Sequence, residues 1–164
     1  MIEGRITLRD ANPEDVQFLA RLYRETRRKE VEAWGWPEEQ MEFFLRMQFD
    51  GQRLSYKATF PNATDRIVCV GGVAAGRMLV GREPEGVRLI DIALLEEYRN
   101  RGIGTGLISQ LLEDCEAQSC ILRLQVLQGN PAIRLYNNLG FIQSGADAMY
   151  IQMEWIPSQK RGRL

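Results

Sequence analysis

The chain contains 164 residues, of which 45% are hydrophobic and 26% are charged. This is the composition of an ordinary soluble domain, and it excludes a disordered chain, a fibre and a coiled coil. The 21 basic and 22 acidic side chains leave a net charge of −1. Because there is no bulk positive charge, we expect neither nucleic acid nor an acidic membrane as a partner.

Histidine is absent from the chain. Ser–His and Cys–His mechanisms and histidine-bound metals are therefore excluded, and acid–base chemistry must use carboxylates, Tyr, Lys, Cys or water. Cys69, Cys115 and Cys120 have no CxxC spacing. We interpret them as free thiols, which predicts a cytoplasmic protein without a metal site. No apolar run approaches the roughly 20 residues of a membrane span, and no signal peptide is recognisable.

The first half of the chain predicts a strand, two helices and a three-stranded meander. The first helix begins at Asn12, a good N-cap, and Pro13 fits the first helical position. We expect this helix to fade in the charged run 27–30. From residue 66 the hydrophobic period changes to two, which is typical of strands. The predicted strands are 6–9, 67–70, 76–81 and 87–95, and the second helix runs from 37 to about 56.

The second half of the chain alternates helices and strands. The clearest helix is 102–119, because its apolar residues form one continuous stripe. A second helix begins at Asn130 and ends at Gly140, a residue type that favours helix ends. Strands are predicted at 121–127, 141–142 and 149–155. This order predicts one α/β (α+β) domain over residues 1–156, followed by a polar, basic, disordered tail at 157–164.

The most informative segment joins the apolar strand 87–95 to the helix that begins near Gly102. A strand this apolar is expected at the centre of a sheet. The backbone N–H groups at such a helix start attract phosphate, and glycine lets the anion approach closely. Arg99 and Arg101 add positive charge at the same place. The segment therefore predicts an anion-binding turn.

Three phosphate-binding patterns compete for this turn. A P-loop would need Gly-Lys-Ser/Thr at its end, which is absent. A Rossmann loop would need a third glycine where Leu107 stands, and the next strand ends in Gln128 instead of an acid. The pattern Arg/Gln-x-x-Gly-x-Gly/Ala is matched at every fixed position by residues 99–104, Arg-Asn-Arg-Gly-Ile-Gly.

With this motif the sequence resembles the GCN5-related N-acetyltransferase (GNAT) superfamily. The segment 129–136, Gly-Asn-Pro-Ala-Ile-Arg-Leu-Tyr, and the Leu-Gly-Phe at 139–141 look like the second half of that family. The two motifs stand in the family's order and at about its spacing, and the resemblance covers nearly the whole chain. It implies a mixed central sheet of about six to seven strands flanked by four helices.

The resemblance also implies where acetyl-CoA would bind as a co-substrate. In this family the pyrophosphate lies on the turn before the third helix, and the pantetheine arm lies along the strand that precedes the turn. An Asn on a later loop commonly contacts the cofactor. The cofactor-binding residues implied here are Leu94, Leu95, Arg99, Asn100, Arg101, Gly102, Ile103, Gly104, Thr105 and Asn130.

The catalytic residues follow from the resemblance and from the chemistry of amines. The Tyr on the short helix, here Tyr136, commonly protonates the departing thiolate in this family. A primary amine must lose a proton before it attacks. Asp91 interrupts the apolar strand and is our candidate base, with Glu96 and Glu97 as alternatives. Each of the two leading candidates also has a structural interpretation, Tyr136 as a core residue and Asp91 as a paired buried acid.

The family builds its acceptor site between the first two helices. Glu32, Trp34 and Trp36 lie there, so they are the candidate acceptor-binding residues, although such residues are as often a solvated acid and packing aromatics. The implied activity is direct transfer of an acetyl group to a primary amine of a small molecule or peptide, by a monomer or homodimer. The alternatives are a non-catalytic acyl-CoA-binding module and, less consistent with the loop, a nicotinamide-dependent oxidoreductase.

Overall fold

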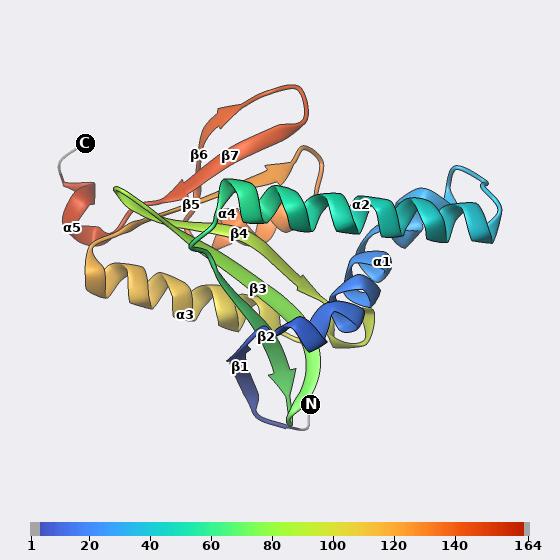
Figure 1. Cartoon of the computed structure of the whole chain (residues 1–164). Coiled ribbons are helices and arrows are strands. Elements are labelled where there is room, and N and C mark those ends of the chain that lie inside the picture. The colour runs from blue at the N-terminus through green and yellow to red at the C-terminus, as the bar shows by residue number, and fades with distance from the viewer. Residues whose placement is uncertain (1–3, 163–164) are drawn as a thin grey trace. The chain divides into compact units, whose positions relative to one another are not determined.

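The computed structural model of the chain describes residues 4–162 (Figure 1). Within this range the helices are α1 (Val16–Glu32), α2 (Glu38–Thr59), α3 (Ile103–Gln118), α4 (Ala132–Asn138) and α5 (Ser158–Arg161), with 3₁₀ turns η1 (Pro13–Asp15) and η2 (Glu96–Tyr98). The strands are β1 (Ile6–Asp10), β2 (Thr64–Val70), β3 (Val73–Glu83), β4 (Gly86–Leu94), β5 (Ile121–Leu127), β6 (Ile142–Ala146) and β7 (Tyr150–Trp155). The predicted order of strands and helices is confirmed up to β7, and the structure adds a fifth, short helix, α5, to the four that were expected.

The strands form one mixed sheet in the order β1-β2-β3-β4-β5-β7-β6. β4 is the fourth of seven, which confirms the central position predicted from its apolar sequence. β4 and β5 are parallel, as strands joined by a crossover helix must be, whereas β1–β2, β5–β7 and β6–β7 are antiparallel. The described residues divide into two compact units, one reaching Leu79 and including Asp91–Arg101, the other comprising Val80–Ile90 and the chain from Gly102 onward.

The start of α1 has the capping arrangement that the sequence predicts. The Asn12 side chain accepts a hydrogen bond from the backbone N–H of Glu14, and Asp15 accepts one from the backbone N–H of Asn12. Arg9 on β1 also donates two hydrogen bonds to Asp15, at 2.7 and 2.9 Å. These bonds tie the first strand to the first helix.

The end of α1 differs from the prediction. The helix passes through the charged run and ends at Glu32, because Arg28 donates a hydrogen bond to Glu32 one turn later at 2.7 Å. Arg27 forms a similar pair with Glu30. Such pairs stabilise a helix that hydrophobic periodicity alone would end earlier. α2 likewise continues past the predicted end at 56 and ends at Thr59.

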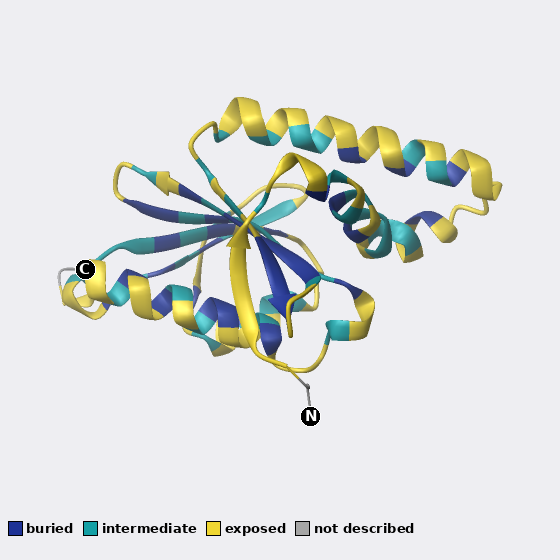
Figure 2. Cartoon of the chain, turned by 60° about the horizontal axis from the view of Figure 1, so that its bottom comes forward, coloured by how far each residue is buried: buried dark blue, intermediate teal, exposed yellow. Residues whose placement is uncertain are grey.

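The core of the first unit lies between α1, α2 and the sheet. Leu19 and Leu22 of α1, Phe49 of α2 and Ile67 of β2 are buried together with Leu95, which follows β4. β1 is exposed along its whole length, whereas most of β2 is buried (Figure 2). α2 is exposed along one side and buries Met41, Leu45 and Phe49 on the other.

The second unit is organised around α3 and β5. α3 buries Ile103, Leu107, Ile108, Leu112 and Cys115, which is most of the apolar stripe that the sequence predicts. β5 buries alternate residues, and an irregularity between Gln143 and Gly145 interrupts the β6–β7 register. The domain boundary predicted at 156 and the disorder predicted for 157–164 stay predictions. In the structure Ser158–Arg161 form α5, and residues 163–164 lie outside the described range.

A close backbone approach in the first unit involves Gly76 on β3. A Cβ atom at this position would overlap the carbonyl oxygen of Ala93 and lie 2.7 Å from the Leu94 Cδ2 atom. Nearby, the backbone N–H of Leu95 donates to the carbonyl oxygen of Ala75 at 2.8 Å. Glycine at this position therefore lets β3 lie against the end of β4.

We expect Gly76→Ala to destabilise the protein by about 1–3 kcal/mol, because the added methyl group must push β3 away from β4. Gly51→Ala is the matched control, since Gly51 lies in the exposed interior of α2 and a Cβ there meets nothing within 4 Å. That substitution should stabilise the protein by about 0.5–1 kcal/mol. Urea unfolding of both variants measures the difference, and equal effects would contradict the close approach.

Candidate active site

The turn after β4 holds its shape through backbone geometry and one arginine. The Arg99 Nε donates a hydrogen bond to the carbonyl oxygen of Leu94 at 2.9 Å, which closes the turn on itself. Asn100 and Gly102 both adopt left-handed conformations, with φ of 59° and 82°. Asparagine tolerates this conformation better than most residues, and glycine adopts it without strain. The shape of the turn therefore depends on Arg99, Asn100 and Gly102, three of the predicted cofactor-binding residues.

Helix α3 begins directly after the turn without any compensating negative charge. Its N-cap is Gly102, no side chain caps it, and its first turn contains no acidic residue. α2 differs, because Glu38 and Glu39 stand in its first turn. The first N–H groups of a helix have no partner within the helix, and its dipole leaves partial positive charge there. The start of α3 is therefore the kind of helix end that binds an anion.

Leu94 and Leu95 lie at the end of β4, as predicted, but they differ in their environments. Leu95 is only 1% exposed and belongs to the core of the first unit. Leu94 is half-buried, and its carbonyl group is already used by Arg99. In the second unit, the β4–β5 ladder pairs Gly86–Leu89 with residues 121–124, and both strands extend past the last of these pairs.

Asp91, the acidic residue of β4, lies in a partly buried environment next to an arginine. Its side chain is 28% exposed, and its Oδ2 lies 3.9 Å from the Arg77 Nη1 on β3. Burial raises the pKa of Asp91 above its ordinary value, and the positive charge of Arg77 acts in the opposite direction. A carboxyl group with a raised pKa is a stronger base, which suits proton removal near neutral pH.

The alternative bases Glu96 and Glu97 have ordinary surface environments. Both lie on η2 and are more than 60% exposed. Glu97 pairs with Arg21 at 3.6 Å and Glu96 with Lys29 at 3.8 Å, both residues of α1. Exposed ion pairs of this kind contribute little free energy and do not activate a carboxylate. Asp91 is therefore the better candidate.

Tyr136 and Asn130 lie in the second unit, at α4 and just before it. Tyr136 is buried, and its ring packs edge-on against Phe141 with centroids 5.5 Å apart. The Asn130 side chain accepts a hydrogen bond from the backbone N–H of Ala132 at 2.9 Å. This bond closes a turn just before α4, but the N-cap residue of the helix is Pro131, so the capping role that the sequence suggested for Asn130 is wrong. A contact of either residue with a cofactor stays a prediction.

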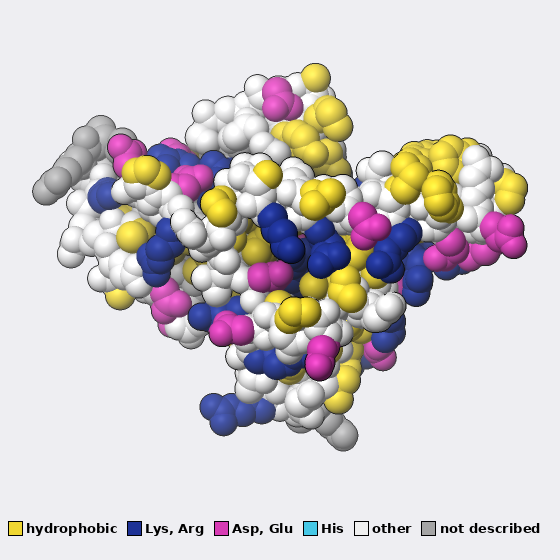
Figure 3. Space-filling view, viewed as in Figure 1, with side chains coloured by type: hydrophobic (Ala, Val, Ile, Leu, Met, Phe, Trp, Pro, Cys, Tyr) yellow, Lys and Arg dark blue, Asp and Glu magenta, His cyan; other side chains and the backbone are white. Residues whose placement is uncertain are grey.

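The predicted acceptor residues lie around the loop between α1 and α2. Trp34, Trp36 and Phe44 form an aromatic cluster with centroid distances of 5.1–5.5 Å. Trp34 is 46% exposed and Trp36 is 37% exposed. Figure 3 shows hydrophobic side chains gathered at this end of α2 with acidic side chains beside them. Glu32 is the last residue of α1 and pairs with Arg28 of the same helix, so its charge is partly neutralised.

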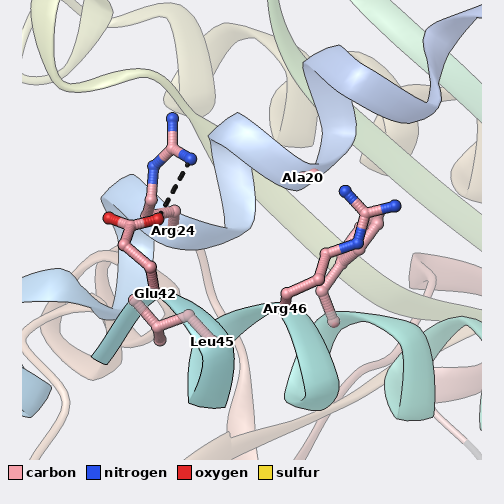
Figure 4. Close-up of a pocket in the computed structure, with 6 residues that line it drawn as sticks. Ala20, Arg24, Glu42, Leu45 and Arg46 are labelled. Carbon is pink, nitrogen blue, oxygen red and sulfur yellow. Dashed lines mark hydrogen bonds and ion pairs between the residues drawn. The ribbon is translucent and has the colours of Figure 1, made fainter. Parts of the chain in front are cut away.

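A small pocket lies between α1 and α2 (Figure 4). Its volume is about 40 Å³, and the ion pair between Arg24 and Glu42 stands at its wall. This is room for about one or two water molecules. The cavity is too small to hold an acceptor substrate. Its other lining residues are Ala20, Leu45, Arg46 and Phe49.

Sequence reasoning missed the charged partners of Asp91. Arg77 on β3 is 8% exposed, and it donates two hydrogen bonds of 2.9 Å to Asp65 on β2. A signal existed, because Arg77 interrupts the otherwise apolar strand as Asp91 interrupts β4. Opposite charges inside two predicted neighbouring strands indicate a buried pair.

The described residues form neither a metal-binding cluster nor a membrane-spanning helix. Residues 4–162 contain no group of three or more side chains that would ligate a metal ion. Nor does this range include a helix with the length and apolarity that a membrane span requires.

Comparison with known proteins assigns the chain to a family. The family model described as the acetyltransferase (GNAT) family matches residues 17–141. This match spans more than half of the sequence and includes the glycine turn, α3 and the Leu-Gly-Phe segment. The chain therefore belongs to the GNAT acetyltransferase family, which confirms the resemblance. No curated protein matches the sequence.

Solved structures of the same fold support this assignment. The PaiA N-acetyltransferase of Thermoplasma acidophilum, in complex with coenzyme A, is 20% identical with a TM-score of 0.71, and the match covers 93% of this chain and 99% of that one. An acetyltransferase of Thermus thermophilus is 18% identical, with a TM-score of 0.69 and coverage of 95% and 99%. The ribosomal-protein-S18-alanine N-acetyltransferase of Escherichia coli is 19% identical, with a TM-score of 0.60 and coverage of 94% and 95%. At these identities the likeness concerns the fold.

We expect Asp91→Asn to raise the melting temperature at pH 8. A carboxyl group whose pKa is raised on folding destabilises the folded protein as pH rises from its ordinary value through the raised one. Asparagine removes this cost, and Arg77 keeps its partner Asp65. The gain should disappear near pH 4, close to the ordinary carboxyl pKa of about 3.9.

Asp147→Asn is the control of opposite sign for this melting experiment. Backbone N–H groups of Tyr150 and Met149 hold the pKa of Asp147 below its ordinary value. Its contribution to stability is therefore present at neutral pH and is lost as pH falls through the lowered pKa. The variant should melt lower than the wild type at pH 8. If both variants moved in the same direction, the environment assigned to Asp91 would be wrong.

Proposed function

We propose that this family member is an N-acetyltransferase that transfers an acetyl group directly from acetyl-CoA to a primary amine of a small molecule or peptide. The observation that carries the proposal is the start of α3. A helix whose first turn has neither a side-chain cap nor an acid follows a turn containing Arg99 and Arg101. These groups suit the pyrophosphate of coenzyme A.

The proposed cofactor contacts are mostly made by backbone. N–H groups of Gly102, Ile103, Gly104 and Thr105 would bind the phosphates, because they belong to the turn and the first turn of α3. Asn100 shapes the turn through its left-handed conformation. We assign the pantetheine arm to the strand end at Leu94 and Leu95, and an amide contact to Asn130 by analogy with the family.

Two side chains would move protons in the proposed reaction. The Asp91 carboxylate takes a proton from the ammonium group, directly or through water, so that the amine nitrogen has a lone pair for attack on the thioester carbonyl. When the tetrahedral intermediate collapses, the C–S bond breaks and the Tyr136 hydroxyl donates a proton to the thiolate. The nitrogen, now bonded to the acetyl carbon, loses its remaining extra proton to water, and water returns a proton to Tyr136. The pKa of Tyr is near ~10 and that of a thiol near ~8.5, so the tyrosine proton can be shared with the thiolate in the transition state.

The cysteines support transfer without an acyl-enzyme intermediate. Burial raises the pKa of Cys115 to about 11, so it stays a thiol at neutral pH. Cys69 is buried within the core of the first unit. We further propose that Glu32, Trp34 and Trp36 contact the acceptor, and that the enzyme acts in the cytoplasm as a monomer or homodimer.

A non-catalytic acyl-CoA-binding module is the second candidate. It is favoured by the structural roles already filled by two predicted site residues, since the Asn130 side chain accepts a hydrogen bond from the backbone N–H of Ala132 and Glu32 pairs with Arg28. Such a module would bind acetyl-CoA without consuming it. Release of thiol in the presence of a panel of primary amines separates the two candidates.

Saturating acetyl-CoA should stabilise the protein by about 2.7 kcal/mol at 100 times the dissociation constant, measured by thermal unfolding with NADH as the control ligand. Gly104→Val should weaken this binding about tenfold or more, because its side chain would stand over the phosphate turn. The fold should survive, since a Cβ at Gly104 meets nothing within 4 Å.

Gly106→Val is the matched control, because it places the same side chain one residue beyond the proposed phosphate contacts. A Cβ there also meets nothing within 4 Å, and the loss of helix propensity should be similar for both variants. Only Gly104→Val is expected to weaken binding. Equal affinities for the two variants would refute the assignment of the turn.

Tyr136→Phe should lower kcat about 100-fold while leaving the affinity for acetyl-CoA within a factor of about two, because it removes a general acid but keeps the ring. The packing against Phe141 should be retained. Tyr150→Phe on β7 is the control for loss of a hydroxyl group. Steady-state thiol release gives kcat, and unchanged turnover in Tyr136→Phe would return this residue to a purely structural role.

A further inference from the structure

Three charged side chains alternate in sign across three neighbouring strands of the first unit. Asp65 lies on β2, Arg77 on β3 and Asp91 on β4. The Nε and Nη2 atoms of Arg77 each donate to one carboxylate oxygen of Asp65 at 2.9 Å. The Nη1 of Arg77 faces Asp91 at 3.9 Å, which is beyond hydrogen-bond distance.

Arg77 is held in place from several sides. Its side chain is only 8% exposed, and its guanidinium group lies 5.7 Å from the ring centroid of Tyr56 on α2. The two carboxylates are more open, Asp65 at 31% and Asp91 at 28% exposed. An arginine that is buried, stacked and bonded through two nitrogen atoms has little freedom to approach a second carboxylate.

We propose that Arg77 is a positioning residue for Asp91. Asp65 holds the guanidinium group in place, so that Arg77 favours the ionised form of Asp91 without forming hydrogen bonds to it. If Arg77 made a two-bond pair with Asp91, the carboxylate would become a weak base with its lone pairs occupied. If Arg77 were absent, the pKa of the carboxyl group would rise further, because burial would no longer be opposed by the positive charge of Arg77. The proposal rests on the proposed function, in which Asp91 removes a proton from the acceptor amine.

Other groups near Asp91 and Arg77 also affect the charge of this network. The backbone N–H of Ile92 favours its ionised form. Tyr23 on α1 has a raised pKa, chiefly because of burial and in part because of Asp91, and it accepts a hydrogen bond from Arg27 at 2.8 Å. Tyr56 contacts Arg77 from α2. Among the described residues of the first unit, Arg77 is the cation that forms an ion pair with Asp91, so it is the group whose removal should matter most.

The network makes two substitutions shift the titration of Asp91 in opposite directions. Arg77→Met removes the positive charge, so the pKa of Asp91 should rise by about one to three pH units. Asp65→Asn removes a negative charge and frees Arg77 to approach Asp91, so this pKa should fall. Arg66→Met is the matched control, because Arg66 lies next to Asp65 on β2, is 49% exposed and pairs with Asp10. It should leave the titration unchanged.

Two independent readouts test the proposal. Carbon-13 NMR of protein labelled at the aspartate carboxyl groups gives the titration of Asp91 directly, with Asp91→Asn used for assignment. The pH dependence of kcat/KM for an amine substrate should show its acid limb moving with the NMR value in each variant. Opposite shifts in the two variants, followed by the acid limb, are the expected result.

Several outcomes would overturn the inference. Shifts of the same sign in Arg77→Met and Asp65→Asn, or shifts no larger than in Arg66→Met, would show that Arg77 does not control Asp91. An acid limb that stayed fixed while the NMR titration moved would show that Asp91 does not set the pH range. If Arg77→Met failed to fold, Asp65→Asn alone would still decide the sign. Absence of turnover in the wild type would contradict the proposed function, whereas the NMR result would still test the coupling.

Discussion

The absence of a side chain at Gly76 is the constraint on which the first unit depends most. Because no Cβ stands there, the backbone of β3 lies against Ala93 and Leu94 at the end of β4. Beside this contact, the Leu95 N–H donates its hydrogen bond to the Ala75 carbonyl oxygen. Fixing the end of β4 in this way also fixes the start of the turn, where Arg99 closes back onto Leu94.

The same pair of strands carries buried charge, which costs desolvation free energy. A buried arginine and a partly buried aspartate lie on adjacent strands, although two well-packed apolar residues would be at least as stable there. Arg77 recovers much of its desolvation cost through Asp65, whereas burial leaves Asp91 with a raised pKa. Arg77 bonds to Asp65 but only faces Asp91. This arrangement stabilises the fold little, but it leaves the Asp91 carboxylate able to accept a proton. Perturbed groups of this kind are more often found at functional sites than in purely structural sheets.

The sequence predicts the order of elements well, because periodicity, caps and glycines are local signals. Asn12, Gly102 and the loop at Trp34–Pro37 act in the structure as those signals indicate. The end of α1 was harder to predict, since the Arg28–Glu32 pair extends it beyond its apolar pattern. The Arg77–Asp91 pair left a signal in two predicted strands, but the bonding of Arg77 to Asp65 could not be derived, because it depends on the register between strands, which packing sets. Glu32 and Asn130 were found as candidates, but the structure adds partners that local sequence does not specify.

In the proposed reaction, the cofactor and the acceptor would be bound by different kinds of group. In this proposal, cofactor recognition would depend on backbone N–H groups at the start of α3, in a turn whose left-handed conformations suit asparagine and glycine. Acceptor recognition would depend on side chains, and here Trp34, Trp36 and Phe44 already pack against one another while staying partly exposed. A backbone site tolerates wide sequence change around a few fixed positions, whereas an aromatic cluster changes its shape with each substitution. The proposed acceptor must therefore be sought through the chemistry of the α1–α2 loop.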